Sequence, residues 1–205
     1  MPDYQSFPIL DMIKQRIFIL LMVCSIGFVK NAAASSYVKN PVDYVNPYMG
    51  NVSHLLVPTY PIVHLPNSML RVYPQRGDYL SDKIHGLPLL QISHRGSFVF
   101  NLSPFQGEES ELKRVFDYDY DNESIKPYHY QVDLCDQQLH AEFAPSHQSA
   151  IYHFDYKQTA KKPYLVFNGG NGEMEINGNV ISGYQNIWNN LRVYIYMEMD
   201  VKPEH

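Results

Sequence analysis

The stretch YHYQVDLCDQQLHAEF, residues 128–143, decides the fold of this chain. Apolar or aromatic side chains stand at every second position on both sides of a short polar turn: Tyr128, Tyr130, Val132 and Leu134 precede it, and Leu139, Ala141 and Phe143 follow it. A period of two is typical of half-buried strands, whose successive side chains point to opposite faces of a sheet. The segment therefore predicts two antiparallel strands joined as a hairpin.

The rest of the chain repeats this signal. Residues 150–156, 164–167 and 193–199 also have strand-like patterns, and Asn177-Gly178 predicts a type I′ hairpin turn, whose two central residues need positive φ. No run of ten or more residues beyond the first 35 shows helical periodicity, and 14 prolines with 17 tyrosines suit strands with irregular connections. We therefore expect an all-β fold, a two-sheet antiparallel β-sandwich that is incomplete at the carboxy terminus.

The first 34 residues have a different composition. Lys14 and Arg16 precede an apolar run of about 13 residues, and three alanines at 32–34 then offer a cleavage site. This pattern predicts a start-site extension plus a secretory signal peptide over residues 1–34 and a β-sandwich domain over 35–205. The run is too short to cross a bilayer, so we expect export without a transmembrane anchor, to the periplasm, the cell surface or the medium.

Two cysteines leave little room for disulfide chemistry. Cys24 falls within the predicted signal, and lipidation there is an alternative to cleavage. Cys135 is then the one thiol of the exported chain, which excludes an internal disulfide.

Charge and motif spacing narrow the functional classes. A formal net charge of −5 with 16 scattered Lys and Arg residues argues against nucleic acid as a partner. The histidines lack the spacing of a zinc motif, and no serine stands in a nucleophile elbow. The acidic run Asp117, Asp119, Asp121 and Glu123 lacks the glycine and glutamate of a calcium loop, and predicts one solvated acidic face. The glycine-rich segment 168–172 predicts a turn. These patterns assign neither a catalytic residue nor a metal ligand.

Six motifs cover, in order, almost all of the expected domain: VNPYMG at 45–50, HLPNSMLRVYP at 64–74, the segment 78–86, SHRGS at 93–97, KPYHYQV at 126–132 and RVYIYME at 192–198. Taken in this order, they resemble the motifs of glycoside hydrolase family 92, an α-mannosidase family. The chain departs from the family at Asn67-Ser68, where the family has glycine, and at Gly86-Leu87-Pro88, which shortens a longer motif. Its only tryptophan is Trp188, so the family's tryptophan near the leaving-group sugar has no counterpart.

The resemblance implies the amino-terminal, carbohydrate-contacting domain of a secreted, exo-acting, calcium-dependent and inverting α-mannosidase. It implies that the catalytic acid, the catalytic base and most calcium ligands belong to a carboxy-terminal (α/α)6 barrel of the same polypeptide, outside this chain. Hence the partners are that barrel and a mannose-containing glycan, and this chain alone is expected to be inactive. The resemblance also implies that Tyr79, Asp82 and His94 bind substrate near the leaving-group sugar.

Two other classes remain open on the residues alone. A stand-alone secreted carbohydrate-binding β-sandwich module would bind glycans without any barrel. A secreted structural or adhesion domain would show neither glycan binding nor a downstream barrel.

Overall fold

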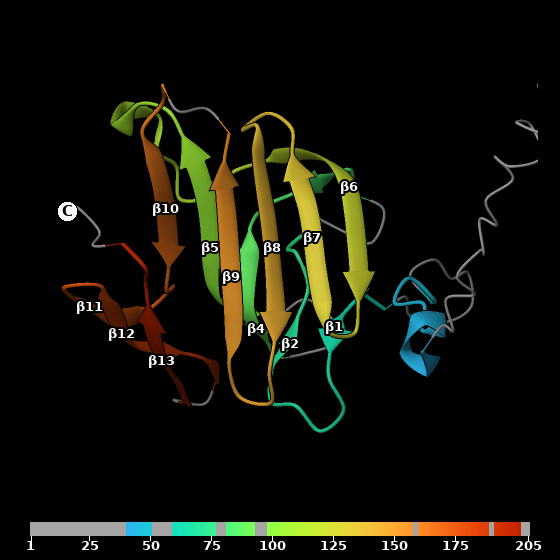
Figure 1. Cartoon of the computed structure of the whole chain (residues 1–205). Helices are drawn as coiled ribbons and strands as arrows, with labels where there is room; N and C mark the ends of the chain where they lie inside the picture. The colour runs from blue at the N-terminus through green and yellow to red at the C-terminus, as the bar shows by residue number, and fades with distance from the viewer. Residues whose placement is uncertain are drawn as a thin grey trace, which may run out of the picture. The chain divides into compact units, whose positions relative to one another are not determined.

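A computed structural model describes residues 40–50, 59–76, 81–92, 98–157, 160–188 and 191–201. All of its elements belong to the unit Pro41–His205, and every strand pairing in it is antiparallel (Figure 1). The helices in these ranges are the short 3-10 turns η1 (Pro41–Tyr44) and η2 (Glu109–Glu111). None of the described segments forms a helix long and apolar enough to cross a membrane. The predicted signal peptide and Cys24 lie outside the described residues.

The largest sheet has five strands in the order β3-β6-β7-β8-β9. Their bounds are β3 (Lys83–Ile84), β6 (Tyr118–Lys126), β7 (His129–Leu134), β8 (Leu139–Pro145) and β9 (Ala150–Tyr156). β7 and β8 are the predicted hairpin, with Tyr130 opposite Phe143 and Leu134 opposite Leu139. Along both strands buried apolar side chains alternate with half-exposed, mostly polar ones, as the period of two requires.

A three-stranded sheet, in the order β10-β5-β4, contributes the other half of the core. Its strands are β4 (Leu87–Gln91), β5 (Phe98–Gln106) and β10 (Pro163–Asn168). β5 is the central strand, and all of its residues after Phe98 are buried. The all-β sandwich predicted from the sequence is confirmed.

Three tyrosine hydroxyls cross from the five-stranded sheet to this second sheet. Tyr118 on β6 donates to the Pro104 carbonyl at 2.9 Å, and Tyr152 on β9 donates to the Pro88 carbonyl at 3.2 Å. Tyr156, also on β9, donates to the carbonyl of Tyr164 on β10 at 2.8 Å. The bulk of each ring fills the core while its polar tip finds a backbone acceptor, which removes the penalty of burying the hydroxyl.

A third sheet, β11-β12-β13, is built from β11 (Gly172–Asn177), β12 (Val180–Asn186) and β13 (Arg192–Glu198). The turn between β11 and β12 lies one residue further along the chain than the sequence predicted. The two residues between the paired Asn177 and Val180 are Gly178 and Asn179, and only Gly178 has positive φ, at 64°. Positive φ at the first central position alone is the pattern of a type II′ turn rather than type I′.

A two-stranded ribbon, β1 (Val63–His64) with β2 (Arg71–Val72), completes the strands. Val63 and Val72 face each other across it and are fully buried in the core.

Candidate functional site

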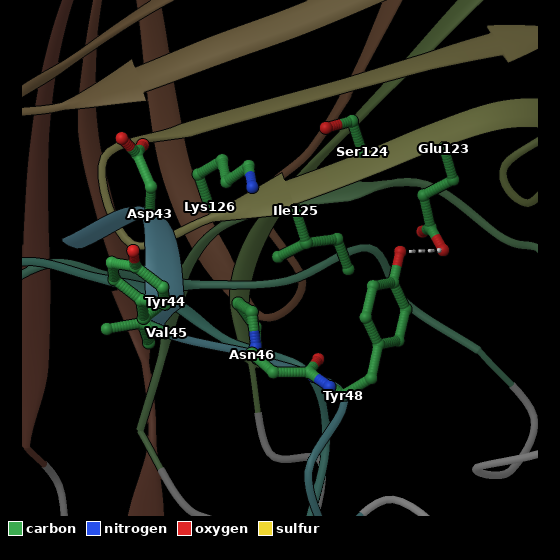
Figure 2. A pocket seen from close by; sticks show the side chains of 10 residues that line it. Asp43, Tyr44, Val45, Asn46, Tyr48, Glu123, Ser124, Ile125 and Lys126 are labelled. Atoms are coloured by element: carbon green, nitrogen blue, oxygen red, sulfur yellow. Dashed lines mark hydrogen bonds between the residues drawn. The ribbon is translucent and has the colours of Figure 1, made fainter. Parts of the chain in front are cut away.

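A pocket of about 300 Å³ lies between residues 43–48 and the second half of β6 (Figure 2). It is lined by Asp43, Tyr44, Val45, Asn46, Pro47 and Tyr48 on one side and by Glu123, Ser124, Ile125 and Lys126 on the other. The first group includes most of the VNPYMG motif. The walls of the pocket combine carboxylate, ammonium, hydroxyl and phenol groups with apolar surface, and this mixture suits a polar organic ligand.

The local sequence explains how this motif is shaped. The Asn46 side-chain oxygen accepts the Tyr48 backbone N–H at 3.0 Å, and the Asn46 carbonyl accepts the Met49 N–H at 3.1 Å. Asparagine followed by proline at the second position of a β-turn is a favoured combination, because proline fixes φ and the asparagine side chain bonds the backbone two residues on. This turn directs the Tyr48 ring toward Glu123, as Figure 2 shows.

Glu123 is the centre of a buried polar network under the pocket. Its carboxylate accepts the Tyr48 hydroxyl at 3.1 Å and the Tyr130 hydroxyl at 3.0 Å, and it pairs with the Arg76 guanidinium. The Arg76 and Glu123 side chains are only 6% and 9% exposed. The Arg76 guanidinium carbon also lies 5.0 Å from the centre of the Tyr120 ring. The two opposite charges and the phenol donors compensate for the loss of water around each ion.

The electrostatics of this network keep its phenols protonated. Burial, and then the nearby negative charge of Glu123, raise the pKa of Tyr48 well above its ordinary value. The same two causes raise the pKa of Tyr130. Both hydroxyls therefore act as hydrogen-bond donors at physiological pH, not as proton acceptors. The arrangement fixes the position of the 45–50 motif against β6, and we assign Glu123 no catalytic role because three donors already engage it.

A β-bulge in β6 brings Glu123 inward. The β6–β7 register shifts between Asp121 and Ser124, so that two residues of β6 oppose one of β7, and Asn122 takes a φ of 52°. Asp119 and Asp121 are exposed, as the sequence predicted for the acidic run. For Glu123 that expectation was wrong, because the bulge turns its side chain to the interior. The partner that could have signalled this, Arg76, is 47 residues away in sequence.

The three predicted substrate-binding residues are described only in part. Asp82 is exposed and directly precedes β3, whose Lys83 pairs with Asp119 near the start of β6. It does not line the pocket, which lies toward the other end of β6. Tyr79 and His94 lie outside the described residues, so the grouping of the three side chains stays a prediction.

Comparisons with known proteins agree on one family. The glycosyl hydrolase family 92 N-terminal domain matches residues 44–205. The solved family GH92 α-mannosidase BT3965 from Bacteroides thetaiotaomicron aligns with a TM-score of 0.59 and 22% identity, over 76% of this chain and 25% of its own. Its complex with mannoimidazole aligns with a TM-score of 0.58 and 22% identity, over 76% and 24%.

This chain thus spans about a quarter of the length of that mannosidase. A search of curated proteins found no match. The structural likeness, at this identity, supports the sandwich fold. The family assignment comes from the match over residues 44–205, which is most of the sequence. On that match, the chain belongs to the family of glycosyl hydrolase family 92 N-terminal domains.

Proposed function

We propose that this chain is the amino-terminal, carbohydrate-contacting domain of a secreted, calcium-dependent, exo-acting and inverting α-mannosidase. The observation that carries the proposal is the family match over residues 44–205, together with the fold that the chain shares with a solved α-mannosidase. The structure adds that the VNPYMG motif of this family resemblance is held in one place by the Tyr48–Glu123 hydrogen bond.

The proposal places hydrolysis outside this chain. Inverting hydrolysis needs an acid and a base about 6.5–9.5 Å apart on opposite sides of the glycosidic bond. The buried Glu123 is committed to Arg76 and two tyrosines, so it is a poor candidate for either role. A barrel contributed by the same polypeptide would supply both groups, and the sandwich would close one side of the glycan site.

Calcium is part of the proposal but is assigned no site in this chain. In the described ranges no three or more His, Cys, Asp or Glu side chains gather closely enough to hold a metal ion. The exposed Asp119 is paired with Lys83, and Asp133 with His140. These residues do not fit a calcium site, and we derive no step through the ion.

Tyr79, Asp82 and His94 are the residues that we propose to contact the leaving-group sugar. The support is positional, because all three fall in segments that resemble the family's pocket-facing loops, and the exposure of Asp82 is compatible with a hydrogen bond to a sugar hydroxyl. In a full-length enzyme, Tyr79→Ala or His94→Ala should lower kcat/KM by the equivalent of about 1–3 kcal/mol without changing Tm. Unchanged kcat/KM in both variants would remove these residues from the site.

Export is proposed from the charged, apolar and small-residue pattern of residues 14–34. Expression of the native gene with amino-terminal sequencing of the exported protein tests this. Processing after the alanines at 32–34 is expected, whereas a lipid on Cys24 would favour the anchored alternative.

One experiment separates the proposal from a stand-alone binding module. The purified chain should release no mannose from α-mannosides with or without calcium, while the product of an extended reading frame that encodes helical repeats should release it. Calcium-dependent mannose release by the chain alone would contradict the division of roles. A reading frame without such repeats, combined with glycan binding, would favour the stand-alone module.

A further inference from the structure

The two faces of the β11-β12-β13 sheet differ in character. Along β13, Val193, Ile195 and Met197 are half-buried, and Met197 packs against the core. Tyr194 and Tyr196 point to the opposite face and are 70% and 71% exposed. Large aromatic side chains placed outward at alternate positions of one strand form a flat apolar surface that the core does not need.

The neighbouring strand extends this surface. Tyr184 on β12 stands directly opposite Tyr194, with ring centres 5.9 Å apart and planes at 54°. The Arg192 guanidinium carbon lies 4.2 Å from the centre of the Tyr184 ring, and the Tyr184 hydroxyl hydrogen-bonds to Glu173 on β11, which raises the pKa of that phenol. The Tyr184 ring is thus held by Arg192 at its face and by Glu173 at its hydroxyl. The side chains of Tyr194 and Tyr196 are exposed to solvent.

Acidic groups dominate the charge of the same face. Glu173 is opposite Tyr184, and Glu175 is opposite Ser182, which is itself opposite Tyr196. Directly paired residues share a face, so both carboxylates border the tyrosines, as does the exposed Glu198 two positions beyond Tyr196. Three carboxylates against the single guanidinium of Arg192 give a net negative surface, which repels anionic polymers.

We propose that this outer face of β11-β12-β13 is a binding surface for a neutral glycan chain, which lies across Tyr184, Tyr194 and Tyr196. Tyrosine rings bury the C–H face of a sugar at a low cost in side-chain entropy, and the carboxylates accept hydrogen bonds from its hydroxyls. Aromatic rings and arginine are also common at protein interfaces, but glutamate is depleted there, and three glutamates favour the sugar. The surface is on a different sheet from the pocket at residues 43–48, and the proposal does not depend on mannosidase activity.

Affinity electrophoresis of the purified chain tests the proposal. Gels would contain a soluble α-mannan, a soluble neutral β-glucan or polygalacturonate. We expect at least one neutral polymer to retard the chain and polygalacturonate to leave its mobility unchanged. The Tyr194→Ala/Tyr196→Ala double variant should bind the neutral polymer about tenfold or more weakly, which corresponds to about 1.4 kcal/mol. Arg192→Ala should weaken binding less, because it only loosens Tyr184.

Tyr128→Ala is the matched control, since Tyr128 is an exposed tyrosine, at 42%, in the turn between β6 and β7. It should bind as the unaltered chain does, and all variants should keep its Tm. The proposal is wrong if no neutral polymer is bound, if the double variant binds like the control, or if polygalacturonate binds as well as the neutral polymers. It is also wrong if the double variant only converts a dimer to a monomer in sedimentation, which would identify a protein interface.

Discussion

Removing the Glu123 carboxylate should destabilise the fold more than any surface change. In a Glu123→Ala variant the Arg76 charge, only 6% exposed, loses its counter-ion, and a stranded buried charge costs about 3–5 kcal/mol. The fully buried Tyr130 hydroxyl loses its acceptor, which adds about 1 kcal/mol. Tyr48 adds little, because it is 40% exposed and water can replace the carboxylate. We expect a loss of about 4–6 kcal/mol and a fall in Tm of about 10–20 °C.

Urea unfolding followed by circular dichroism, in a double-mutant cycle, measures this cost. Arg76→Met/Glu123→Leu removes both charges together and should cost no more than about 2 kcal/mol, because hydrophobic replacement of a whole buried pair is often near neutral. The sum of the losses in the single variants Arg76→Met and Glu123→Leu should therefore exceed the loss in their double variant by more than about 3 kcal/mol. A loss below about 1.5 kcal/mol for Glu123→Ala, with no coupling to Arg76, would refute the buried network.

Three further outcomes are expected. Hydrogen bonds from His153 and then His129 hold the pKa of Glu142 below its usual 4.5. The ionised carboxylate therefore stabilises the fold above that pH, and its contribution is lost as the pH falls through the lowered pKa. In urea titrations, Glu142→Gln should be less stable than the unaltered chain at pH 7 and nearly equal to it near pH 3. Tyr118→Phe removes a buried bridge between the sheets and should lower the free energy of unfolding by about 0.5–1.5 kcal/mol, whereas the same change at exposed Tyr128 should leave it within error. An added Cβ at Gly183, where φ is 154°, would lie 2.1 Å from a backbone oxygen. Gly183→Ala should therefore lower the urea midpoint further than Gly178→Ala, where the positive φ is strained for alanine but the added Cβ meets no neighbouring atom. Equal shifts would contradict the close approach of the strands at Gly183.

The sequence was most informative where one local rule governed the structure. The alternation across residues 130–143 predicted β7, β8 and their buried face, because the pleat of a strand alone decides which side chains point inward. Tyr128, which the same alternation included in the first strand, instead lies in the turn between β6 and β7 and is 42% exposed. The same rule placed Val193, Ile195 and Met197 on the inner side of β13. The β11–β12 turn was found but shifted by one residue, since its position depends on strand pairing as well as on the Asn-Gly signal.

The candidate site could not be predicted in the same way. The Arg76–Glu123 pair joins residues 47 positions apart, and the bulge at Asn122 reverses the facing that a simple period of two assigns to Glu123. Local periodicity carries no information on such a distant partner. The motif at 45–50 was recognised through its family resemblance, yet its attachment to β6 through Tyr48 became visible only in the tertiary structure.

The tyrosine hydroxyls that cross between the two core sheets have a consequence for how the layers are aligned. Apolar contact is non-directional, so the apolar faces of the two sheets alone would allow one sheet to slide over the other at little cost in free energy. A phenol that donates to one particular carbonyl permits only one position of one sheet relative to the other. Three such hydrogen bonds fix that position, from Tyr118, Tyr152 and Tyr156 to three separate carbonyls. Replacing all three tyrosines by phenylalanine would preserve nearly all of the buried area while allowing the two sheets to slide relative to each other. This motion should be detected as faster amide hydrogen exchange in β10 and β4 before any large change in Tm.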